Sequence, residues 1–416
     1  MKVLYTIVAL ICVLNPLYSS AESPDSSDQQ LAMSVPYVLV DGKRIVSLPK
    51  GVSHFDPALR QTITTISNIS VINPDEPMVY YKTKAGLKPI TELYKLSFYE
   101  VVEGLLGQDI SKPDQKELDN LYLYMISPPE GCSGLDNLIG RLIERKQSKS
   151  NASPEAKIFY TIMAAIQKSM AGRYNQARGV IKFDGKSFGD DFLAIICPKG
   201  VPAHFGRLLE SMLVLHMDHE LNASTNAVRQ VASTDADLTS AIIAGLCALS
   251  GPKHGGASEA VLEMLDKIKD FDAFRTAVRS KEAKIMGVGH AIYKKTDPRA
   301  EIMRSLLEAN IAHLNINLQH YKLLKQIEHF VLSDEYFTSR GLAPNVDFYS
   351  GILYEGMGFK RNQITPLFAL ARVIGWMAHY NEQRQPPNQL MRPSAITLDT
   401  HQKLQKAQRS KEEKKE

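Results

Sequence analysis

After residue 82, apolar residues repeat at helical spacing. The repeat is clearest in two segments, at Leu238, Ile242, Gly245 and Leu249 and at Leu367, Leu370, Ile374 and Ala378. Intervals of three and four residues place these side chains on one face of a helix. Two pairs, Asp297-Pro298 and Thr365-Pro366, put a capping side chain before a proline that suits the first helical position. We therefore predict that helices begin at both pairs.

Before residue 83 the pattern favours short strands. The pieces YVLV, RIVSL and MVYY between residues 36 and 82 are rich in residues that strands prefer, and the turn-forming pieces Asp41-Gly42 and NPDEP separate them. The chain is thus expected to be mainly α-helical, with a few short N-terminal strands.

The composition is that of an ordinary globular protein. Of the 416 residues, 44% are hydrophobic and 23% are charged, which excludes wholesale disorder and a polytopic membrane protein. The 49 basic and 45 acidic residues leave a formal charge of +4, which is too small to indicate nucleic-acid binding. No segment after residue 21 resembles a membrane span.

Residues 1–21 resemble a cleavable signal peptide for export. Lys2 precedes an apolar run from Val3 to Leu14 that is too short to span a bilayer, and Ser19-Ser20-Ala21 offers small residues before a cleavage site. A buried first helix is the other interpretation, but Asn15-Pro16 interrupts it. We predict cleavage after Ala21.

Cleavage would leave three cysteines, Cys132, Cys197 and Cys247, without a CxxC spacing. An odd number without that spacing indicates neither a disulfide framework nor a zinc site. Cys197 and Cys247 stand in apolar stretches, where a free cysteine usually acts as a small core residue. We predict that both are packing residues.

Polar residues that a helical core does not explain gather in five places. These are HMDHE at 216–220, GPKHGG at 251–256, GVGH at 287–290, NVDF at 345–348, and the arginines 299, 372 and 392. Arg372 is the clearest case because it interrupts an apolar helix, where an unpaired guanidinium is costly to bury. Either an anionic ligand or a core carboxylate should lie beside it.

His216 and His219 are three residues apart, so we expect them to share one face of a helix. They could bind a metal, pack as core histidines, or line a polar site. The spacing is not HExxH and no third ligand is evident, which disfavours a metal.

Glycines flank His254 and His290, which stops a helix and lets another group approach closely. GVGH lacks the third glycine and the strand-turn-helix context of a dinucleotide-binding motif. Alone, each histidine would be a turn residue about as often as a site residue, and Asp347 would usually be a helix cap.

Together, these motifs resemble the citrate synthase family, including 2-methylcitrate synthases. The similarity covers residues 204–382 almost continuously, through LHMDHELNAST, GPKHGGASEAVLEML, KIMGVGHAIYKKTDPRA, NVDFYSG and ARVIGWMAHYNEQ in the family's order. It is looser over 56–107 and faint over 108–200. The resemblance implies condensation of an acyl-CoA with a 2-oxo acid.

The resemblance places the three catalytic residues at His254, His290 and Asp347. A thioester methyl group is a very weak acid, so a carboxylate must take its proton while a donor stabilises the oxygen of the enolate. Asp347 would be this base and His254 this donor. His290 would protonate the ketone oxygen that the enolate attacks, a task suited to a group that titrates near neutrality.

The resemblance also implies the ligand-binding groups. The oxaloacetate carboxylates would be bound by His219, Arg299, Arg372 and Arg392. In the family the last of these comes from the partner subunit, so a homodimer is expected. His216 would support these groups from behind, and Lys294 and Lys295 would meet the CoA phosphates. The CoA thioester is a substrate, and no metal or resident cofactor is required.

The fold implied is mainly α-helical, with a large helical domain and a smaller helical domain that close over the substrates. The large domain would span 36–253 and return over 364–402, with the small domain at 254–363. Residues 22–35 would form a flexible lead-in and residues 403–416 a charged, solvated tail.

Two departures from the family pattern concern the substrates. Ser258 stands where the family's GGAN has asparagine, and NPDEPMVYYKTKAG replaces the usual IDG-x-x-G-x-L-x-YRG. The expected function is that of a citrate synthase, which forms citrate and CoA from acetyl-CoA and oxaloacetate. A 2-methylcitrate synthase that uses propionyl-CoA is the alternative, because one methyl group changes binding by only ~1 to 3 kcal/mol.

The predicted signal peptide conflicts with these substrates, which are made inside cells. A cytoplasmic enzyme that starts at Met33 would resolve the conflict, as would an exported enzyme delivered to a location that contains CoA. The third hypothesis is an exported binding protein on an old enzyme scaffold, against which the intact His254, His290 and Asp347 argue. The substrates favour the cytoplasm.

Overall fold

The computed structural model describes residues 64–73, 75–111, 134–146, 152–171, 187–197, 201–251 and 253–393, and the backbone of two strands at 37–40 and 43–47. The chain divides into two units, Met1–Ile66 with Arg392–Glu416, and Ser67–Met391. The predicted signal peptide, lead-in and charged tail lie outside the described residues, as does Cys132.

The first unit contains one described strand pair. Strands β1 (Tyr37–Val40) and β2 (Lys43–Ser47) are antiparallel, and their register shifts between Val38 and Leu39. The strands predicted from YVLV and RIVSL are confirmed.

The second unit begins with a three-stranded antiparallel sheet in the order β3-β4-β5. Its strands are β3 (Ser70–Asn73), β4 (Met78–Thr83) and β5 (Gly86–Pro89). In β4, Val79 and Tyr81 alternate with more exposed residues and are fully buried, so one face of the sheet packs on the helices. β4 confirms the strand predicted from MVYY, whereas the sequence pattern did not indicate β3 or β5.

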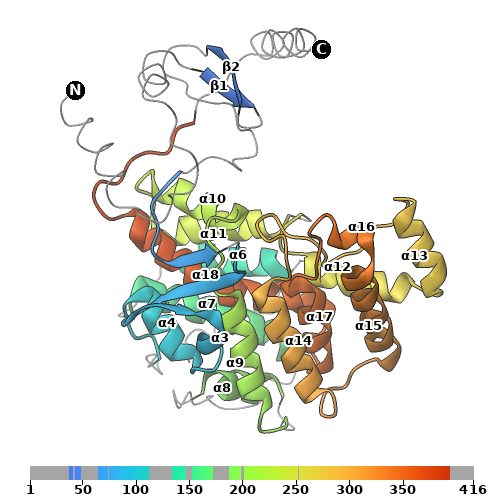
Figure 1. Ribbon diagram of the computed structural model, residues 1–416. Coiled ribbons are helices and arrows are strands. Elements are labelled where there is room, and N and C mark those ends of the chain that lie inside the picture. The colour runs from blue at the N-terminus through green and yellow to red at the C-terminus, as the bar shows by residue number, and fades with distance from the viewer. Residues whose placement is uncertain are drawn as a thin grey trace. The chain divides into compact units, whose positions relative to one another are not determined.

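Helices make up most of the second unit, which confirms the mainly α-helical prediction. They are α3 (Ile90–Leu93), α4 (Phe98–Leu106), α6 (Gly134–Arg145), α7 (Pro154–Ala171), α8 (Phe188–Ile196), α9 (Phe205–His216), α10 (Ala223–Ala232), α11 (Leu238–Leu249), α12 (Ala257–Lys267), α13 (Phe271–Arg279), α14 (Pro298–Asn310), α15 (Leu318–Ser333), α16 (Glu335–Thr338), α17 (Val346–Gly356) and α18 (Arg361–Gln383). Figure 1 shows α12 to α17 gathered on one side of this unit, and the sheet with α3 and α4 on the other.

Helix α18 connects these two groups of elements. It packs against α4, α6, α7, α9, α10 and α11 as well as against α12 and α17. Its predicted apolar face is buried, and it carries Trp376, the largest fully buried side chain in the described chain. Burial on so many sides explains why α18 is apolar over most of its length.

One predicted helix start is confirmed and the other is wrong. Asp297 caps α14 by accepting the Arg299 amide, and Pro298 is the first helical residue. Helix α18, however, begins at Arg361 rather than at Thr365, and Pro366 lies inside it. Glu259 of α12 accepts both the amide and the hydroxyl of Thr365, so α12 supplies hydrogen bonds at the place where proline interrupts the helical ladder.

The cysteine prediction also fails in part. Cys197 is half-buried, but Cys247 is exposed. The buried stripe of α11 runs through Ile242, Gly245 and Leu249, and Cys247 lies two residues from Gly245, on the opposite side of the helix. An apolar stretch therefore did not guarantee burial of each of its members.

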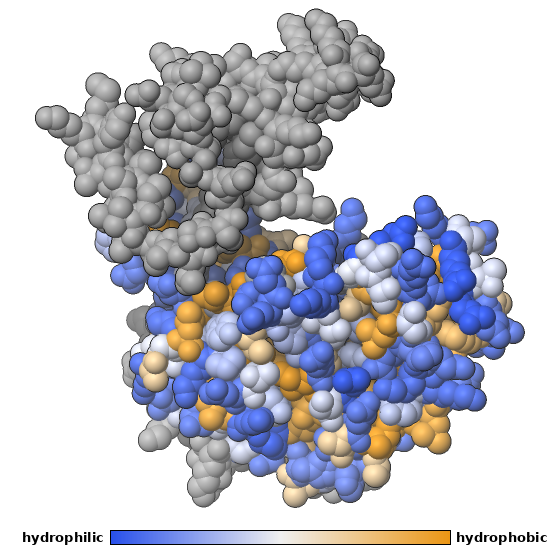
Figure 2. Space-filling view, viewed as in Figure 1, coloured by the Kyte–Doolittle hydropathy of each residue, from blue (hydrophilic) through white to orange (hydrophobic). Residues whose placement is uncertain are grey.

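The visible face of the second unit is mainly polar. Figure 2 shows hydrophilic residues over most of it, with apolar residues between them in small groups. Among the helices that the structure describes, none combines the length and apolar character needed to cross a membrane.

Candidate active site

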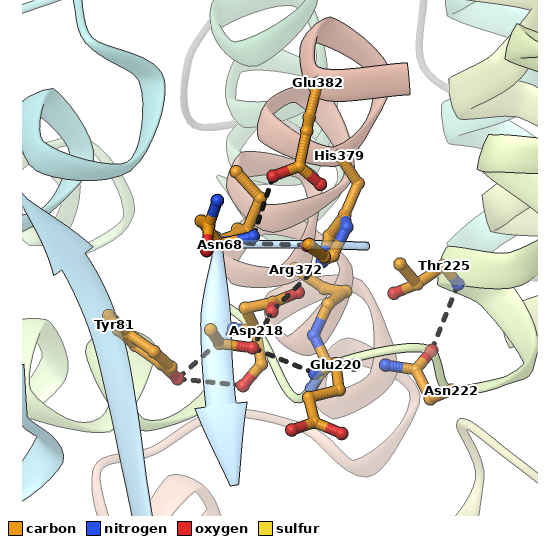
Figure 3. Close-up of polar contacts among 12 residues, drawn as sticks. Asn68, Tyr81, Asp218, Glu220, Asn222, Thr225, Arg372, His379 and Glu382 are labelled. Atoms are coloured by element: carbon orange, nitrogen blue, oxygen red, sulfur yellow. Dashed lines mark hydrogen bonds and ion pairs between the residues drawn. The ribbon is translucent and has the colours of Figure 1, made fainter. Parts of the chain in front are cut away.

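The chain leaves helix α9 before it reaches His219. Helix α9 ends at His216, and Glu220 adopts a positive φ of 49°, so the two histidines do not share a helix face and that prediction is wrong. The cause is Asp218, which is fully buried and accepts hydrogen bonds from Ser70 Oγ and, at 3.2 Å, from His379 Nε2. These contacts draw residues 217–220 between strand β3 and helix α18 (Figure 3).

Tyr81 and a chain of buried polar side chains hold the loop of residues 217–220 in place. The Tyr81 hydroxyl lies 2.9 Å from the Asp218 carbonyl oxygen. On the other side of Asp218, His379 Nδ1 accepts a hydrogen bond from Arg229 at 3.0 Å, and Arg229 forms an ion pair with Glu382 at 2.7 Å. Burial by itself would raise the pKa of Asp218, but His379 holds it below its usual value.

Arg372 projects from α18 beside this loop without a carboxylate of its own. It is 2% exposed, its Nε donates to the His216 carbonyl at 2.7 Å, and its guanidinium lies 4.8 Å from the centre of the Phe368 ring. Within the described part of the chain no ion pair involves it. Burial lowers the pKa of Arg372 to about 10. Of the two partners predicted for Arg372, the described structure provides no paired core carboxylate.

Arg299, in contrast, forms an ion pair with a carboxylate. Its Nε and Nη2 donate to the two oxygens of Asp297 at 3.1 and 2.7 Å, and both side chains are buried. Burial opposes the charge, yet Asp297 raises the pKa of Arg299 above its ordinary value. The positive charge of Arg299 acts on His219, His290 and Asp347.

His219 and His290 meet at a buried tyrosine. Their rings lie 5.0 Å apart, and Tyr293 contacts both, with its hydroxyl 3.2 Å from His219 Nε2. His290 Nδ1 accepts the backbone amides of Ile292 and Tyr293 at 3.0 and 3.4 Å. Because Nδ1 is an acceptor, the neutral ring carries its hydrogen on Nε2. Tyr293 was missed, and its place three residues after His290 in GVGHAIY was the available indication.

The histidines of the site are neutral at pH 7. Burial, with a contribution from Arg299, lowers the pKa of His290 to about 4, and burial with Arg372 lowers the pKa of His254 to about 4. The pKa of His219 is also lowered well below its usual range, mainly by burial. The expectation that His290 titrates near neutrality therefore does not hold for the unliganded protein.

A glycine-rich turn presents His254 at the end of α11. A Cβ on Gly255 would lie 2.3 Å from the Leu249 carbonyl oxygen, so this turn requires glycine. His254 is half-buried, and its Nε2 lies 2.8 Å from Ser224 Oγ. Ser224 is fully buried and also lies 2.7 Å from Asn222 Oδ1. Ser224 was not singled out in the sequence, although it belongs to the motif HELNAST.

Backbone hydrogen bonds join the loops that carry His290 and Asp347. Gly289 N donates to Ala343 O at 2.8 Å, and Asn345 N donates to Gly287 O at 2.9 Å. Gly287 has φ of 73°, and a Cβ there would lie 2.8 Å from Phe348 Cα, so the two loops are as close as glycine allows.

Asp347 is the second residue of α17, where the helix dipole favours a negative charge. Its Oδ1 accepts the Ser258 hydroxyl at 2.8 Å, and the Asn345 side chain accepts its amide. Burial raises the pKa of Asp347 above its usual value, although Ser258 and Arg299 favour the charged form. The residue that caps α17 is Asn345.

The model of the C-terminal domain of citrate synthase matches residues 58–394. The chain belongs to the citrate synthase family. A citrate synthase from Corynebacterium glutamicum is 31% identical over 380 residues, which cover 83% of this chain and 86% of the relative.

Solved citrate synthases share the fold of this family member. The structure from Thermoplasma acidophilum, a ternary complex with carboxymethyl coenzyme A and oxaloacetate, gives a TM-score of 0.68 at 25% identity and covers 82% of this chain and 95% of its own. The structure from Thermotoga maritima gives a TM-score of 0.66 at 29% identity, with coverage of 82% and 95%.

Among the described residues of this citrate synthase fold, one group has side chains that could bind a metal ion. Ligand atoms of His219, His290 and Asp297 lie within 4.8 Å of one another. Both Asp297 oxygens already accept hydrogen bonds from Arg299, however, and His290 Nδ1 accepts two amides. The carboxylate is therefore arranged to hold the guanidinium.

The remaining predicted residues lie around or apart from this cluster. His216 is buried, and its ring Nδ1 lies 2.8 Å from Met212 O. Its backbone carbonyl accepts the hydrogen bond from Arg372. Lys294 and Lys295 are exposed, and Lys295 Nζ donates to Asp75 O at 3.3 Å. Arg392 is exposed and belongs to the first unit.

Proposed function

We propose that this chain condenses acetyl-CoA with oxaloacetate and hydrolyses the thioester product to citrate and CoA. The observation that carries the proposal is that two buried guanidiniums, Arg299 and Arg372, act on a desolvated carboxylate, Asp347, and on neutral histidines. A small dicarboxylate would match the positive charge, and the carboxylate and imidazoles supply acid–base groups. Similarity to citrate synthases from several organisms supports this pair of substrates.

Asp347 is the proposed base for the acetyl methyl group. Its raised pKa makes it a stronger base than an exposed carboxylate, while the Ser258 hydroxyl and the start of α17 favour its ionised form. Oδ1 accepts the Ser258 hydroxyl, so Oδ2 is left to take the proton.

His254 is the proposed donor to the thioester oxygen. At pH 7 the neutral ring carries one hydrogen. The single hydrogen of Ser224 has two neighbouring acceptors, Asn222 Oδ1 and His254 Nε2. When Ser224 donates to Nε2, the ring hydrogen is on Nδ1, which then donates to the oxygen as the enolate forms.

His290 is the proposed donor to the ketone oxygen of oxaloacetate. Its Nε2 carries the hydrogen because Nδ1 accepts two amides. Burial, the field of Arg299 and the two amides at Nδ1 keep the ring neutral, so His290 acts as a hydrogen-bond donor. Its Nε2–H would donate to the ketone oxygen and stabilise the negative charge that develops there as the new carbon–carbon bond forms.

We also propose that the enzyme is a homodimer in which Arg392 of the partner subunit completes the carboxylate site with His219, Arg299 and Arg372. The exposed Lys294 and Lys295 are the proposed contacts to the CoA phosphates. The CoA thioester is a substrate, and the roles proposed for Asp347, His254 and His290 in the condensation use only side chains of this protein.

For localisation, the substrates support a cytoplasmic enzyme, whereas the composition of residues 1–21 supports export. N-terminal sequencing of the native protein distinguishes the two. A first residue of Met33 supports the cytoplasm, and Glu22 supports export.

The function is tested by release of free CoA thiol from purified residues 22–416, with acetyl-CoA or propionyl-CoA and with or without oxaloacetate. We expect release that depends on oxaloacetate and is faster with acetyl-CoA. Asp347→Asn should lower kcat by about 10²- to 10⁴-fold in a folded protein. A preference for propionyl-CoA would indicate the 2-methylcitrate reaction, and no release from folded dimers would reject the proposed reaction.

A further inference from the structure

Two serine hydroxyls stand behind the Asp347 carboxylate. Ser258 Oγ lies 2.8 Å from Asp347 Oδ1 and 2.8 Å from Ser350 Oγ. Both serines are buried, with exposed fractions of 6% for Ser258 and 0% for Ser350. An ionised carboxylate only accepts hydrogen bonds, so Ser258 donates to Asp347 and Ser350 must donate to Ser258.

Tight packing of α12 against α17 holds this pair. Ser258 is the second residue of α12, and both Asp347 and Ser350 belong to the first turns of α17. A Cβ on Gly351 would lie 2.7 Å from the Ser258 carbonyl oxygen, closer than real Cβ contacts come. The backbones of the two helices therefore fix the position of the Ser258 hydroxyl relative to the carboxylate.

We propose that Ser258, supported by Ser350, is a positioning residue that occupies Oδ1 of Asp347 and aims Oδ2 at the substrate methyl group. The inference rests on the proposed function, in which Asp347 is the base. A hydroxyl that accepts one hydrogen bond is a better donor of the next, so Ser350 strengthens the bond that holds the carboxylate. No proton passes along the pair, because Asp347 accepts and returns protons at Oδ2 only.

The serine pair is chemically distinct from the other groups that act on Asp347. The charged groups that face it are Arg299 and Asp297 at the start of α14 and Arg372 in α18. All three remain when Ser258 is changed. Ser258→Ala therefore removes one donor to the ionised form and leaves the burial and the surrounding charges in place, so the pKa of Asp347 rises.

The test compares Ser258→Ala and Ser350→Ala with Ser305→Ala, a control at an exposed serine of α14. For Ser258→Ala we expect kcat with acetyl-CoA to fall by about 10- to 100-fold, as for loss of a charge-assisted hydrogen bond, while KM for oxaloacetate changes less than about twofold. The acid limb of kcat should move to higher pH by about one unit, and deuterated acetyl-CoA should show a larger isotope effect. Ser350→Ala should change each readout in the same direction as Ser258→Ala, with an effect that is about two- to fivefold smaller.

The outcomes separate this inference from the proposed function. Wild-type kcat and an unchanged acid limb in Ser258→Ala would overturn the inference, as would a rise in KM for oxaloacetate with kcat unchanged. If Ser258→Ala fails to fold, Ser350→Ala becomes the test, because it keeps the hydroxyl that donates to Asp347. A shift of its acid limb to higher pH would support the inference, and no shift would overturn it. Activity retained by Asp347→Asn would reject the proposed base itself, whereas an inactive Asp347→Asn beside an unaffected Ser258→Ala would reject only the role of the serines.

Discussion

Protonating the buried histidines of the site is unfavourable in the folded protein. His216 is 1% exposed and burial lowers its pKa to about 3, while burial and Arg299 keep the pKa of His219 well below its usual range. In the unfolded chain both would bind a proton near pH 6.5. The unfolded state therefore binds more protons between the folded and unfolded pKa values, and stability rises with pH in that window and levels off above it.

We predict that acid destabilises the protein through these histidines. Lowering the pH from 7.5 to 5 should reduce the free energy of unfolding by about 2 kcal/mol for each fully buried histidine. His216→Gln should reduce the pH dependence, and His329→Gln, at an exposed histidine of α15, should not. Urea unfolding at both pH values measures this, and equal slopes for His216→Gln and the wild-type protein would contradict it.

At the scale of the elements, α18 packs closely against the loop of residues 217–220. A Cβ on its Gly375 would lie 2.4 Å from Met217 O and 2.6 Å from Asp218 Oδ1. The loop can therefore pass this close to α18 only because Gly375 has no side chain. This loop carries His219 and follows the His216 carbonyl group, which accepts a hydrogen bond from Arg372.

We predict that Gly375→Ala moves this loop. Alanine in place of a helical glycine usually stabilises a helix by up to about 1 kcal/mol, but here overpacking should reduce stability by about 1–3 kcal/mol. KM for oxaloacetate should rise at least about tenfold, because 1 Å of misplacement is enough to weaken a carboxylate contact. Gly140→Ala in α6 is the matched control, since a Cβ there meets nothing within 4 Å. Similar stability and KM in both variants would contradict the prediction.

At the scale of the whole molecule, the site proposed here draws residues from two subunits. Asp347→Asn and Arg392→Ala should each abolish most activity, the first in its own site and the second in the partner's. When the two variants are unfolded together and refolded, half of the dimers are hybrids, and each hybrid has one intact site. The mixture should regain about a quarter of wild-type activity. Recovery no greater than the sum of the separate variants would place Arg392 in the site of its own subunit.

Parts of this fold followed from local sequence. The buried face of α11 was predicted from spacing, because helical periodicity depends only on neighbours a few residues apart. The start of α14 followed from Asp297 and Pro298 for the same reason. The order of the motifs around His254, His290 and Asp347 indicated the family, which the comparisons confirm.

Tertiary structure alone decided how those residues are paired. The hydrogen bond from Ser258 to Asp347 joins residues 89 apart, and the bond from His379 to Asp218 joins residues 161 apart. The path of the chain from His216 to His219 depends on the long-range contacts of Asp218 with Ser70 and His379. The low pKa of His290 likewise depends on burial and on the field of Arg299. Local spacing does not encode these properties, because burial and charge–charge distances arise only when distant segments pack together.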